Sequence, residues 1–240
     1  MNRIKVLLWD IDGTILNFKA AEKAAVRKGF LNMSLGECTD EMISVYSSIN
    51  DKYWKLLENG ELTKPEILVF RFRDFFAQYG IDPDLAAPFN AQYQFDLGDT
   101  ICFNDNADKL LPSLSEKYRQ FAVTNGTAHA QHKKLRLSGL IDIFDACFIS
   151  DEIGFEKPSK EYFESVFAKI REKVAFSPEE AMIIGDSLTS DITGGIRAGI
   201  RTCWYNPGKL ENTSGLRIDC EIHDLNEIRQ ILSACGGEND

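Results

Sequence analysis

The chain has 240 residues, of which 44% are hydrophobic and 27% are charged, and its formal net charge is −10. This length allows one large α/β domain or a core domain with a smaller inserted one, and the composition excludes an extended disordered protein. Because the basic residues are scattered, the charge argues against a nucleic-acid polymer as partner, and any phosphate-bearing partner should be small.

The six cysteines show neither CxxC spacing nor a compact disulfide framework, and no signal peptide is recognised before the first apolar run. We therefore expect a cytoplasmic protein with reduced, buried thiols. The apolar stretches reach only the length of a strand, so we expect no membrane partner. The terminal "GGEND" is expected to be disordered. The sequence does not predict the oligomeric state.

In chain order, five apolar runs predict strands. The first, "IKVLLWD" at 4–10, is nearly continuous, which is typical of a strand buried on both faces of a parallel sheet. The later runs are "FAVTN" at 121–125, "ACFIS" at 146–150, "AMIIGD" at 181–186 and "RTCWYN" at 201–206. Helical stretches lie between these runs, for example at 128–137 and 160–173. The alternation predicts a Rossmann-like, doubly wound α/β sheet.

One segment, 17–96, has helical periodicity and no convincing strand. Within it, five apolar residues fall on one helix face and are expected to form packing core. They are Leu68, Phe72, Phe75, Phe76 and Tyr79. Phe70 and Arg71 lie off this stripe and are candidates for substrate contact. We predict an α/β core domain at 1–16 and 97–240 and an inserted helical domain at 17–96, over the carboxyl ends of the strands, where open α/β sheets bind ligands.

Polar residues follow three of the predicted strands. Asp10 and Asp12 follow the first, Thr124 and Asn125 the second, and Asp186 the fourth. Parallel strands bring their carboxyl ends to one edge of the sheet, so we expect these side chains to converge. Lys157 in "FEKPS" and Asp191 in "GDSLTSD" complete the set.

Four carboxylates in one crevice would raise one another's pKa values unless a cation neutralised them. Carboxylate oxygens suit Mg²⁺, which also takes phosphate oxygens as ligands. Lys157 and the Thr124 hydroxyl are the donors that a bound phosphate needs. Residues two apart in extended backbone share a face, so Asp10 can attack while Asp12 moves protons.

These motifs resemble those of the haloacid dehalogenase (HAD) superfamily of phosphohydrolases. "DIDGT" at 10–14 is similar to its first motif, "TNG" at 124–126 to its second, Lys157-Pro158 to its third and "GDSLTSD" at 185–191 to its fourth. The motifs occur in the family's order, and the insertion after the first motif matches the helical cap of the subfamily with small-molecule substrates. "NGELTKPEILVFRF" at 59–72 and "SDITGGIRAGIRTCWYN" at 190–206 are further similar to bacterial pyrimidine 5′-nucleotidases that act on non-standard nucleotides.

The resemblance implies a role for each matching residue. Asp10 would be the nucleophile and a Mg²⁺ ligand, and Asp12 the general acid/base whose backbone carbonyl also binds the metal. Thr124 and the following amides of Asn125 and Gly126 would bind the phosphate, and Lys157 would bridge the nucleophile and the phosphate. Asp186 would bind the metal directly, and Asp191 would support the metal site without binding the ion. The implied reaction is hydrolysis of a small phosphomonoester through an aspartyl-phosphate.

Other interpretations stay open at this stage. Taken alone, Asp12-Gly13 is also typical of a simple turn, and Asp186 and Asp191 of helix caps. The same site would serve a sugar-phosphate or phosphoglycolate phosphatase, and the same fold a catalytically silent phosphate-binding module. A dehalogenase is disfavoured because Asp12 would then have no leaving oxygen to protonate.

Overall fold

The computed structural model describes residues 3–236. These residues form two compact units: a sheet unit of residues 3–17, 103–128 and 138–236, and a helical unit of residues 18–102 and 129–137. The predicted domain boundaries at residues 16–17 and 96–97 stay a prediction. Residues 237–240 of the tail that was expected to be disordered lie outside the described part.

The sheet unit contains six parallel strands in the order β3-β2-β1-β4-β5-β6. The strands are β1 (Val6–Trp9), β2 (Arg119–Thr124), β3 (Ala146–Ile149), β4 (Ala181–Gly185), β5 (Arg201–Tyr205) and β6 (Cys220–Ile222). All four residues of β1 are buried, as the continuous apolar run predicts for an interior strand. The predicted doubly wound α/β fold is confirmed, and β1 lies between β2 and β4.

The sixth strand, β6, was not predicted from the sequence. It has three residues, one of them the exposed Glu221, and it pairs with β5 at the edge of the sheet. Three residues are too few to show the apolar run or the alternation that identifies a strand. Its pairing with β5 is therefore visible only in the structure.

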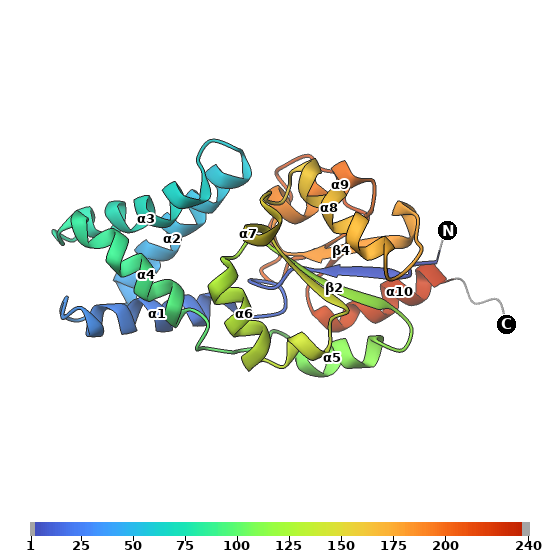
Figure 1. The fold of residues 1–240 in the computed structure, drawn as a ribbon, viewed down its shortest axis with the longest axis horizontal. Helices are drawn as coiled ribbons and strands as arrows, with labels where there is room; N and C mark the ends of the chain where they lie inside the picture. Colours follow the sequence, from blue (N-terminus) through green and yellow to red (C-terminus); the bar gives the residue numbers. More distant parts are fainter. Residues whose placement is uncertain (1–2, 237–240) are drawn as a thin grey trace. The chain divides into compact units, whose positions relative to one another are not determined.

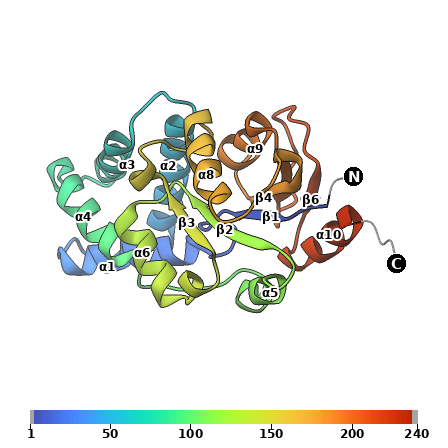
Figure 2. The ribbon, with the colours of Figure 1, turned by 45° about the vertical axis from the view of Figure 1, so that its right-hand side comes forward.

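Helices cover both faces of the sheet. Figures 1 and 2 show α8 and α9 on one face and α5 and α10 on the other. The helices of this unit are α5 (Ala107–Leu114), α7 (Ser150–Ile153), α8 (Lys160–Arg171), α9 (Thr193–Ala198) and α10 (Ile228–Gly236), and Ala128 begins α6 (Ala128–Leu137). Short helical turns are η2 (Leu140–Asp142), η3 (Pro178–Glu180), η4 (Leu188–Ile192, a π-helical turn) and η5 (Leu225–Glu227).

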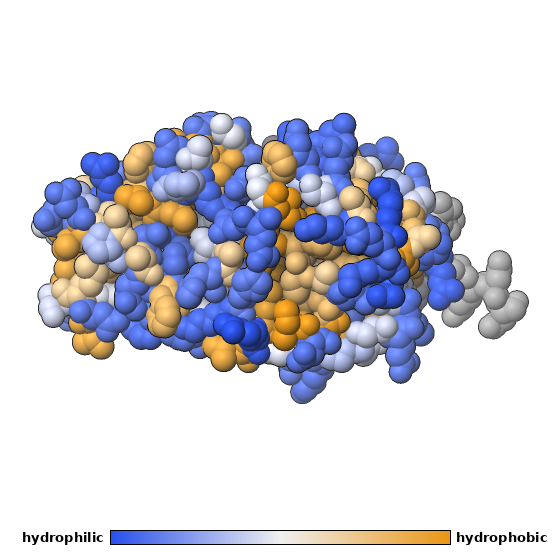
Figure 3. Space-filling model, in the orientation of Figure 1, coloured by the Kyte–Doolittle hydropathy of each residue, from blue (hydrophilic) through white to orange (hydrophobic). Residues whose placement is uncertain are grey.

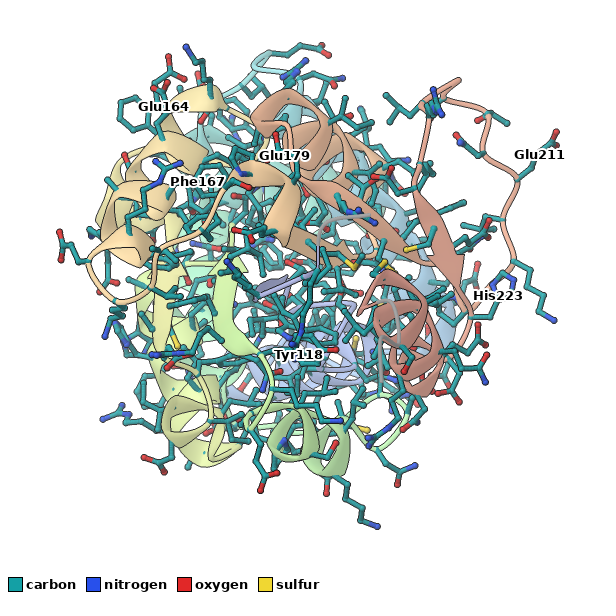
Figure 4. The ribbon with its side chains drawn as sticks, turned by 90° about the vertical axis from the view of Figure 1, so that its right-hand side faces the viewer. Tyr118, Glu164, Phe167, Glu179, Glu211 and His223 are labelled. Carbon is teal, nitrogen blue, oxygen red and sulfur yellow. The ribbon has the colours of Figure 1, made fainter. Side chains whose placement is uncertain are left out.

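The amphipathic pattern of α8 explains its position. The Ser159 side chain caps the helix by accepting a hydrogen bond from the backbone N–H of Tyr162, at 3.3 Å. Phe167 belongs to the apolar cluster that packs on the sheet, whereas Glu164 is on the solvent side of the helix (Figure 4). The helix therefore buries one face against β1, β2 and β4 and leaves the other hydrated.

The helical unit is built mainly from long helices. They are α1 (Phe18–Asn32), α2 (Asp40–Glu58), α3 (Lys64–Gln78) and α4 (Ala86–Asp96), with the turn η1 (Pro83–Leu85) and residues 129–137 of α6. At the start of α3, the Glu66 side chain accepts a hydrogen bond from the Thr63 backbone N–H at 2.8 Å, and Pro65 occupies the first turn. These signals explain why the helix begins there.

The predicted apolar stripe of α3 is the core of this unit. Phe72, Phe75 and Phe76 are fully buried, and the Phe72 ring stacks on Tyr46 with centroids 4.8 Å apart. Leu68 and Tyr79 are partly buried at the margin of the apolar clusters. The expectation of a packing face is confirmed for these residues.

The outer surface contains both hydrophilic and apolar residues. Figure 3 shows hydrophilic residues over most of one face, with apolar residues in separate small groups. Across residues 3–236, no helix combines the length and the apolar character needed to cross a membrane.

Candidate active site

Three of the predicted acidic residues meet at the carboxyl ends of β1 and β4. Asp10 follows β1, Asp186 follows β4, and Asp191 lies in η4. Each of these side chains offers a carboxylate oxygen within 4.8 Å of the other two. The register Trp9↔Ile184 aligns the ends of the two strands, which is why residues so far apart in the sequence converge.

Lys157 joins two of these carboxylates. Its Nζ donates to Asp10 Oδ1 at 2.8 Å, to Asp191 Oδ1 at 2.7 Å and to the Val123 carbonyl at 2.9 Å. The lysine is only 1% exposed. Burial alone would lower the pKa of the Lys157 ammonium, but the charges of Asp10 and Asp191 outweigh it and raise that pKa. The side chain therefore stays a cation inside the site.

One carboxylate oxygen of Asp10 lacks a hydrogen-bond partner within residues 3–236. Burial raises the pKa of Asp10 to about 7, with Lys157 opposing the rise and Asp191 adding to it. Whereas Oδ1 accepts from Lys157, Oδ2 is buried and has no hydrogen-bond partner among the described residues. Such orphaned polar atoms are rare in folded proteins and indicate a place where a ligand completes the site.

Asp191 is fully engaged by the protein. Its Oδ1 accepts from Lys157, and its Oδ2 accepts from the Ser187 backbone N–H at 3.1 Å. Gly185, at the end of β4, makes this position possible, because a Cβ there would lie 2.3 Å from the Asp191 carboxyl carbon. The sequence motifs did not predict that residue 185 must lack a side chain for Asp191 to fit.

The backbone between Asp12 and Leu16 is a tight loop held against Asp186. Gly13 has φ +100°, and a Cβ at this residue would lie 2.4 Å from Asp186 Oδ2. The Thr14 hydroxyl donates to Asp186 Oδ1 at 3.1 Å and accepts from the Asp186 backbone N–H at 3.0 Å. The first motif thus positions Asp186 as well as supplying Asp10.

Thr124 and Asn125, at the end of β2, lie beside Lys157. The Asn125 side chain makes two hydrogen bonds of 2.8 Å to the Lys157 backbone, one to its carbonyl and one from its N–H. Thr124 is 1% exposed, and its hydroxyl accepts from the Gly126 backbone N–H at 3.1 Å. The Asn125 side chain therefore holds the backbone of Lys157 in place. From the sequence, Asn125 was expected only to bind phosphate, so this positioning role was not predicted.

Two further residues support the site, and the sequence motifs assigned neither of them a role there. Asn104 Nδ2 donates to the Gly13 carbonyl at 3.3 Å and to the Thr14 carbonyl at 2.9 Å. Trp204 Nε1 donates to the Asp186 backbone carbonyl at 2.9 Å. Both contacts join segments distant in sequence, so no local pattern could have revealed them.

Comparison with known proteins identifies the family. Residues 4–199 match the model of the haloacid dehalogenase-like hydrolases. The HAD-hydrolase YfnB of Bacillus subtilis is 40% identical over 233 residues, covering 97% of both chains. The pyrimidine 5′-nucleotidase PynA of Streptococcus pneumoniae is 36% identical, covering 95% of this chain and 94% of its own.

A more distant relative and a solved structure extend this result. The pyrimidine 5′-nucleotidase YjjG of Escherichia coli is 27% identical, covering 94% of this chain and 96% of its own. The crystal structure of YfnB bound to magnesium has a TM-score of 0.90 to this fold at 39% identity, covering 96% of this chain and 99% of that one. The chain belongs to the haloacid dehalogenase-like hydrolases.

Proposed function

We propose that the protein is a Mg²⁺-dependent phosphatase that hydrolyses small phosphomonoesters, with pyrimidine nucleoside 5′-monophosphates as its substrates. One observation carries this proposal: Oδ2 of Asp10 is buried without a hydrogen-bond partner in the described part of the chain, next to the Lys157 ammonium at the carboxyl end of an interior strand. A buried carboxylate oxygen that the protein leaves unsatisfied is well placed to act as a nucleophile or a ligand.

The side chains of the site fit a hard divalent cation. Asp10, Asp186 and Asp191 contribute oxygen donors, the ligand type that Mg²⁺ prefers. The ion would be held by the side chains of Asp10 and Asp186 and by the Asp12 carbonyl. Asp191, whose two oxygens already accept hydrogen bonds, would not bind the ion directly and would instead keep Lys157 in position. When bound, Mg²⁺ would supply positive charge to the phosphoryl oxygens and relieve the repulsion among the carboxylates.

The residues of the chain then divide the work. Asp10 Oδ2 attacks phosphorus and forms an aspartyl-phosphate, while Asp12 gives a proton to the leaving oxygen and later takes one from the attacking water. Lys157 holds Asp10 in place and carries positive charge to the phosphoryl group. The Thr124 hydroxyl, with the backbone amides of Asn125 and Gly126, binds the phosphoryl oxygens.

The substrate class rests on the relatives. PynA and YjjG, which cover nearly the whole chain, are named pyrimidine 5′-nucleotidases. Relatives at 24–28% identity are named glyceraldehyde 3-phosphate phosphatases and support a second candidate, a sugar-phosphate phosphatase. PynA, at 36% identity, is more similar than any of these phosphatases and favours the nucleotide.

A substrate panel tests this proposal. The full chain with Mg²⁺ is assayed for phosphate release from dUMP, UMP, dTMP, purine nucleotides, phosphoglycolate and sugar phosphates. We expect the highest kcat/KM for a pyrimidine nucleotide. A preference for sugar phosphates would replace the substrate class, and no hydrolysis of any member or of an aryl phosphate would favour the silent binding module.

The Asp12→Asn variant separates proton transfer from metal binding. We expect it to lose turnover, because the side chain can no longer exchange protons with the leaving group. Mg²⁺ binding, measured by calorimetry, should survive because the backbone carbonyl is unchanged. Loss of Mg²⁺ binding would contradict the division of roles between Asp10 and Asp12.

A further inference from the structure

Three of the six cysteines gather at the β6 edge of the sheet, and the proposed phosphatase reaction uses none of them. Cys203 lies on β5, Cys220 on β6 and Cys235 on α10. The sheet register makes Cys203 and Cys220 direct Cα partners on neighbouring parallel strands. Paired residues of such strands point to the same face of the sheet. The Cys220 thiol donates a hydrogen bond to the Thr202 carbonyl, next to Cys203 on β5, at 3.5 Å.

The spacing of the two strands is compatible with a disulfide. Neighbouring strands lie about 4.8 Å apart, and disulfides join Cα atoms that are about 4.4–6.8 Å apart. Both cysteines are free thiols in this structure. A bond between them would require the two side chains to rotate toward each other, while the strand pairing that sets the Cα separation stays in place.

The two thiols differ in their readiness to react. The neighbouring Cys203 thiol lowers the pKa of the Cys220 thiol, with a smaller contribution from the charge of Arg201, whereas burial and the charge of Asp219 oppose the lowering. Cys220 is partly exposed, whereas Cys203 is fully buried. Because the thiolate is the nucleophile, Cys220 should react first with an oxidant from solvent.

Three of the four remaining thiols have clearly different surroundings. Cys235 is buried, and its Sγ accepts a hydrogen bond from Arg201 Nη1 at 3.2 Å. Burial raises the pKa of Cys147 to about 11, which keeps that thiol protonated. Cys102 is exposed, contrary to the expectation that the cysteines are buried, and it provides an internal reference for unassisted oxidation.

We propose that Cys203 and Cys220 form a reversible disulfide when a peroxide oxidises the chain. The Cys220 thiolate attacks one peroxide oxygen, the O–O bond breaks, and Cys220 becomes a sulfenic acid as the second oxygen leaves as water or alcohol. The Cys203 thiol then attacks the Cys220 sulfur: the S–S bond forms, the S–O bond breaks, and water leaves with the Cys203 proton. The two sulfurs lose two electrons, the peroxide gains them, and a dithiol reverses the change.

The bond would change the edge of the sheet. β6 has three residues and is the last strand of the order, so its attachment depends on a short pairing with β5. The segment between the cysteines includes the loop that carries Glu211, which Figure 4 shows outside β6. A disulfide would close this loop and link the edge strand covalently to β5. Because the cross-link lowers the conformational entropy of the unfolded chain, it would stabilise the folded protein and oppose detachment of β6.

The test uses the reduced full-length protein. It is treated with hydrogen peroxide, the remaining thiols are alkylated, and the intact mass and the peptides are determined by mass spectrometry. We expect the loss of two hydrogens, a linked peptide pair containing Cys203 and Cys220, and reversal by dithiothreitol. The oxidised protein should melt about 5 °C higher than the reduced protein. A link through Cys235, or Cys102 oxidised with no Cys203–Cys220 link, would overturn the proposal.

Serine variants identify the order of the steps. Cys220→Ser should lose both the linked peptide and the rise in Tm, whereas Cys235→Ser, the matched control, should keep both. Cys203→Ser should stop at the sulfenic acid on Cys220, which a cyclic 1,3-diketone traps. If Cys203→Ser fails to fold, the wild-type peptide map and the other two variants still decide the outcome. None of these readouts depends on phosphatase activity, so this inference and the proposed function can fail separately.

Discussion

Each unit of the molecule buries a cluster of charged side chains, and the two clusters differ in how they are satisfied. In the sheet unit, three carboxylates lie together, two of them bonded to Lys157, and Oδ2 of Asp10 has no partner among the described residues. In the helical unit, one buried carboxylate, Glu22, is connected through Asn50 to one buried guanidinium, Arg71, and Lys19 at its margin lies 3.6 Å from Glu22 Oε2. The first cluster has excess negative charge, and the second is balanced.

The balanced cluster is connected by hydrogen bonds across the helices. Asn50 donates to Glu22 Oε1 at 2.8 Å and accepts from Arg71 Nη1 at 2.6 Å, and Arg71 Nη2 donates to Asn90 Oδ1 at 3.0 Å. Ser47 also donates to Glu22. Arg71 Nε lacks a partner among residues 3–236, but the guanidinium lies 5.0 Å from the Phe72 ring centroid.

This difference distinguishes a site that needs a ligand from a cluster that stabilises the fold. Burying a charge is costly unless it is paired, so a balanced and bonded pair fits a structural role. An unbalanced group of acids is tolerated where a cation completes it. Four changes test whether the contrast holds.

The largest effect is expected from Asp10→Asn. We expect kcat to fall by at least about 10³-fold because the nucleophile is lost. Thermodynamic stability, measured by urea unfolding, should be equal or higher, because one of three crowded carboxylates is removed and Lys157 still pairs with Asp191. Asp108→Asn, an exposed acid on α5, is the matched control and should change neither quantity. Retained hydrolysis would refute the mechanism.

Arg71→Met tests the other side of the comparison. Removing the guanidinium leaves the buried Asn50 oxygen without its donor and Glu22 with only the more exposed Lys19 as a nearby cation, and we expect the free energy of unfolding to fall by about 1–3 kcal/mol. The kcat for an aryl phosphate, measured well below the melting temperature, should stay near the wild-type value. Arg73→Met, on the exposed face of α3, is the control. A raised KM for nucleotides at unchanged stability would instead support the hypothesis that Arg71 contacts substrate.

Mg²⁺ should act on the sheet unit through the unbalanced cluster. A chelator should abolish hydrolysis, and Mg²⁺ should restore it. At about 100 times its dissociation constant, Mg²⁺ should add about 2.7 kcal/mol to the free energy of unfolding, as expected for a ligand that binds only the folded state. Asp186→Asn should reduce this stabilisation. If Mg²⁺ stabilises that variant as much as the wild type, Asp186 is not a ligand.

The smallest effect is expected from Glu22→Gln, as a change in pH dependence. Burial raises the pKa of Glu22 in the folded protein, with Lys19 and Ser47 opposing. Above its unfolded pKa the unfolded chain releases the proton while the folded protein keeps it, so this residue lowers stability as pH rises toward the folded pKa. We expect unfolding at pH 4 and pH 7 to show the variant gaining stability relative to wild type at the higher pH. An unchanged difference would indicate that Glu22 is ionised in both states throughout this range.

The elements with strong local signals were predicted well. The apolar run at 4–10 contains β1, and the stripe on α3 packs as expected. The sequence reading missed β6, whose three residues leave no periodicity to detect. It also placed Arg71 off the apolar stripe as a candidate for substrate contact, whereas the structure buries it with 1% exposure among aromatic rings. An arginine is buried when a partner is available, and here the partners come from other helices.

The candidate site shows the same division. The motifs place Asp10, Thr124, Lys157 and Asp186 near one edge of the sheet, since each follows a strand or loop of the alternating pattern. The motifs do not show that the Asn125 side chain holds the Lys157 backbone, or that Gly185 makes room for Asp191. These contacts depend on side-chain direction and close approach, which strand periodicity does not specify.

By itself, the sequence determined the α/β class, the order of the motifs and the family, because these depend on local periodicity and on residue types at fixed spacing. Only the tertiary structure decided which buried charges are balanced and which oxygen of Asp10 has no partner from residues 3 to 236. Lys157 and Asp10 are 147 positions apart, and Thr14 and Asp186 are 172 positions apart. Interactions over such separations follow from strand register and packing, and these become defined only when the sheet has formed.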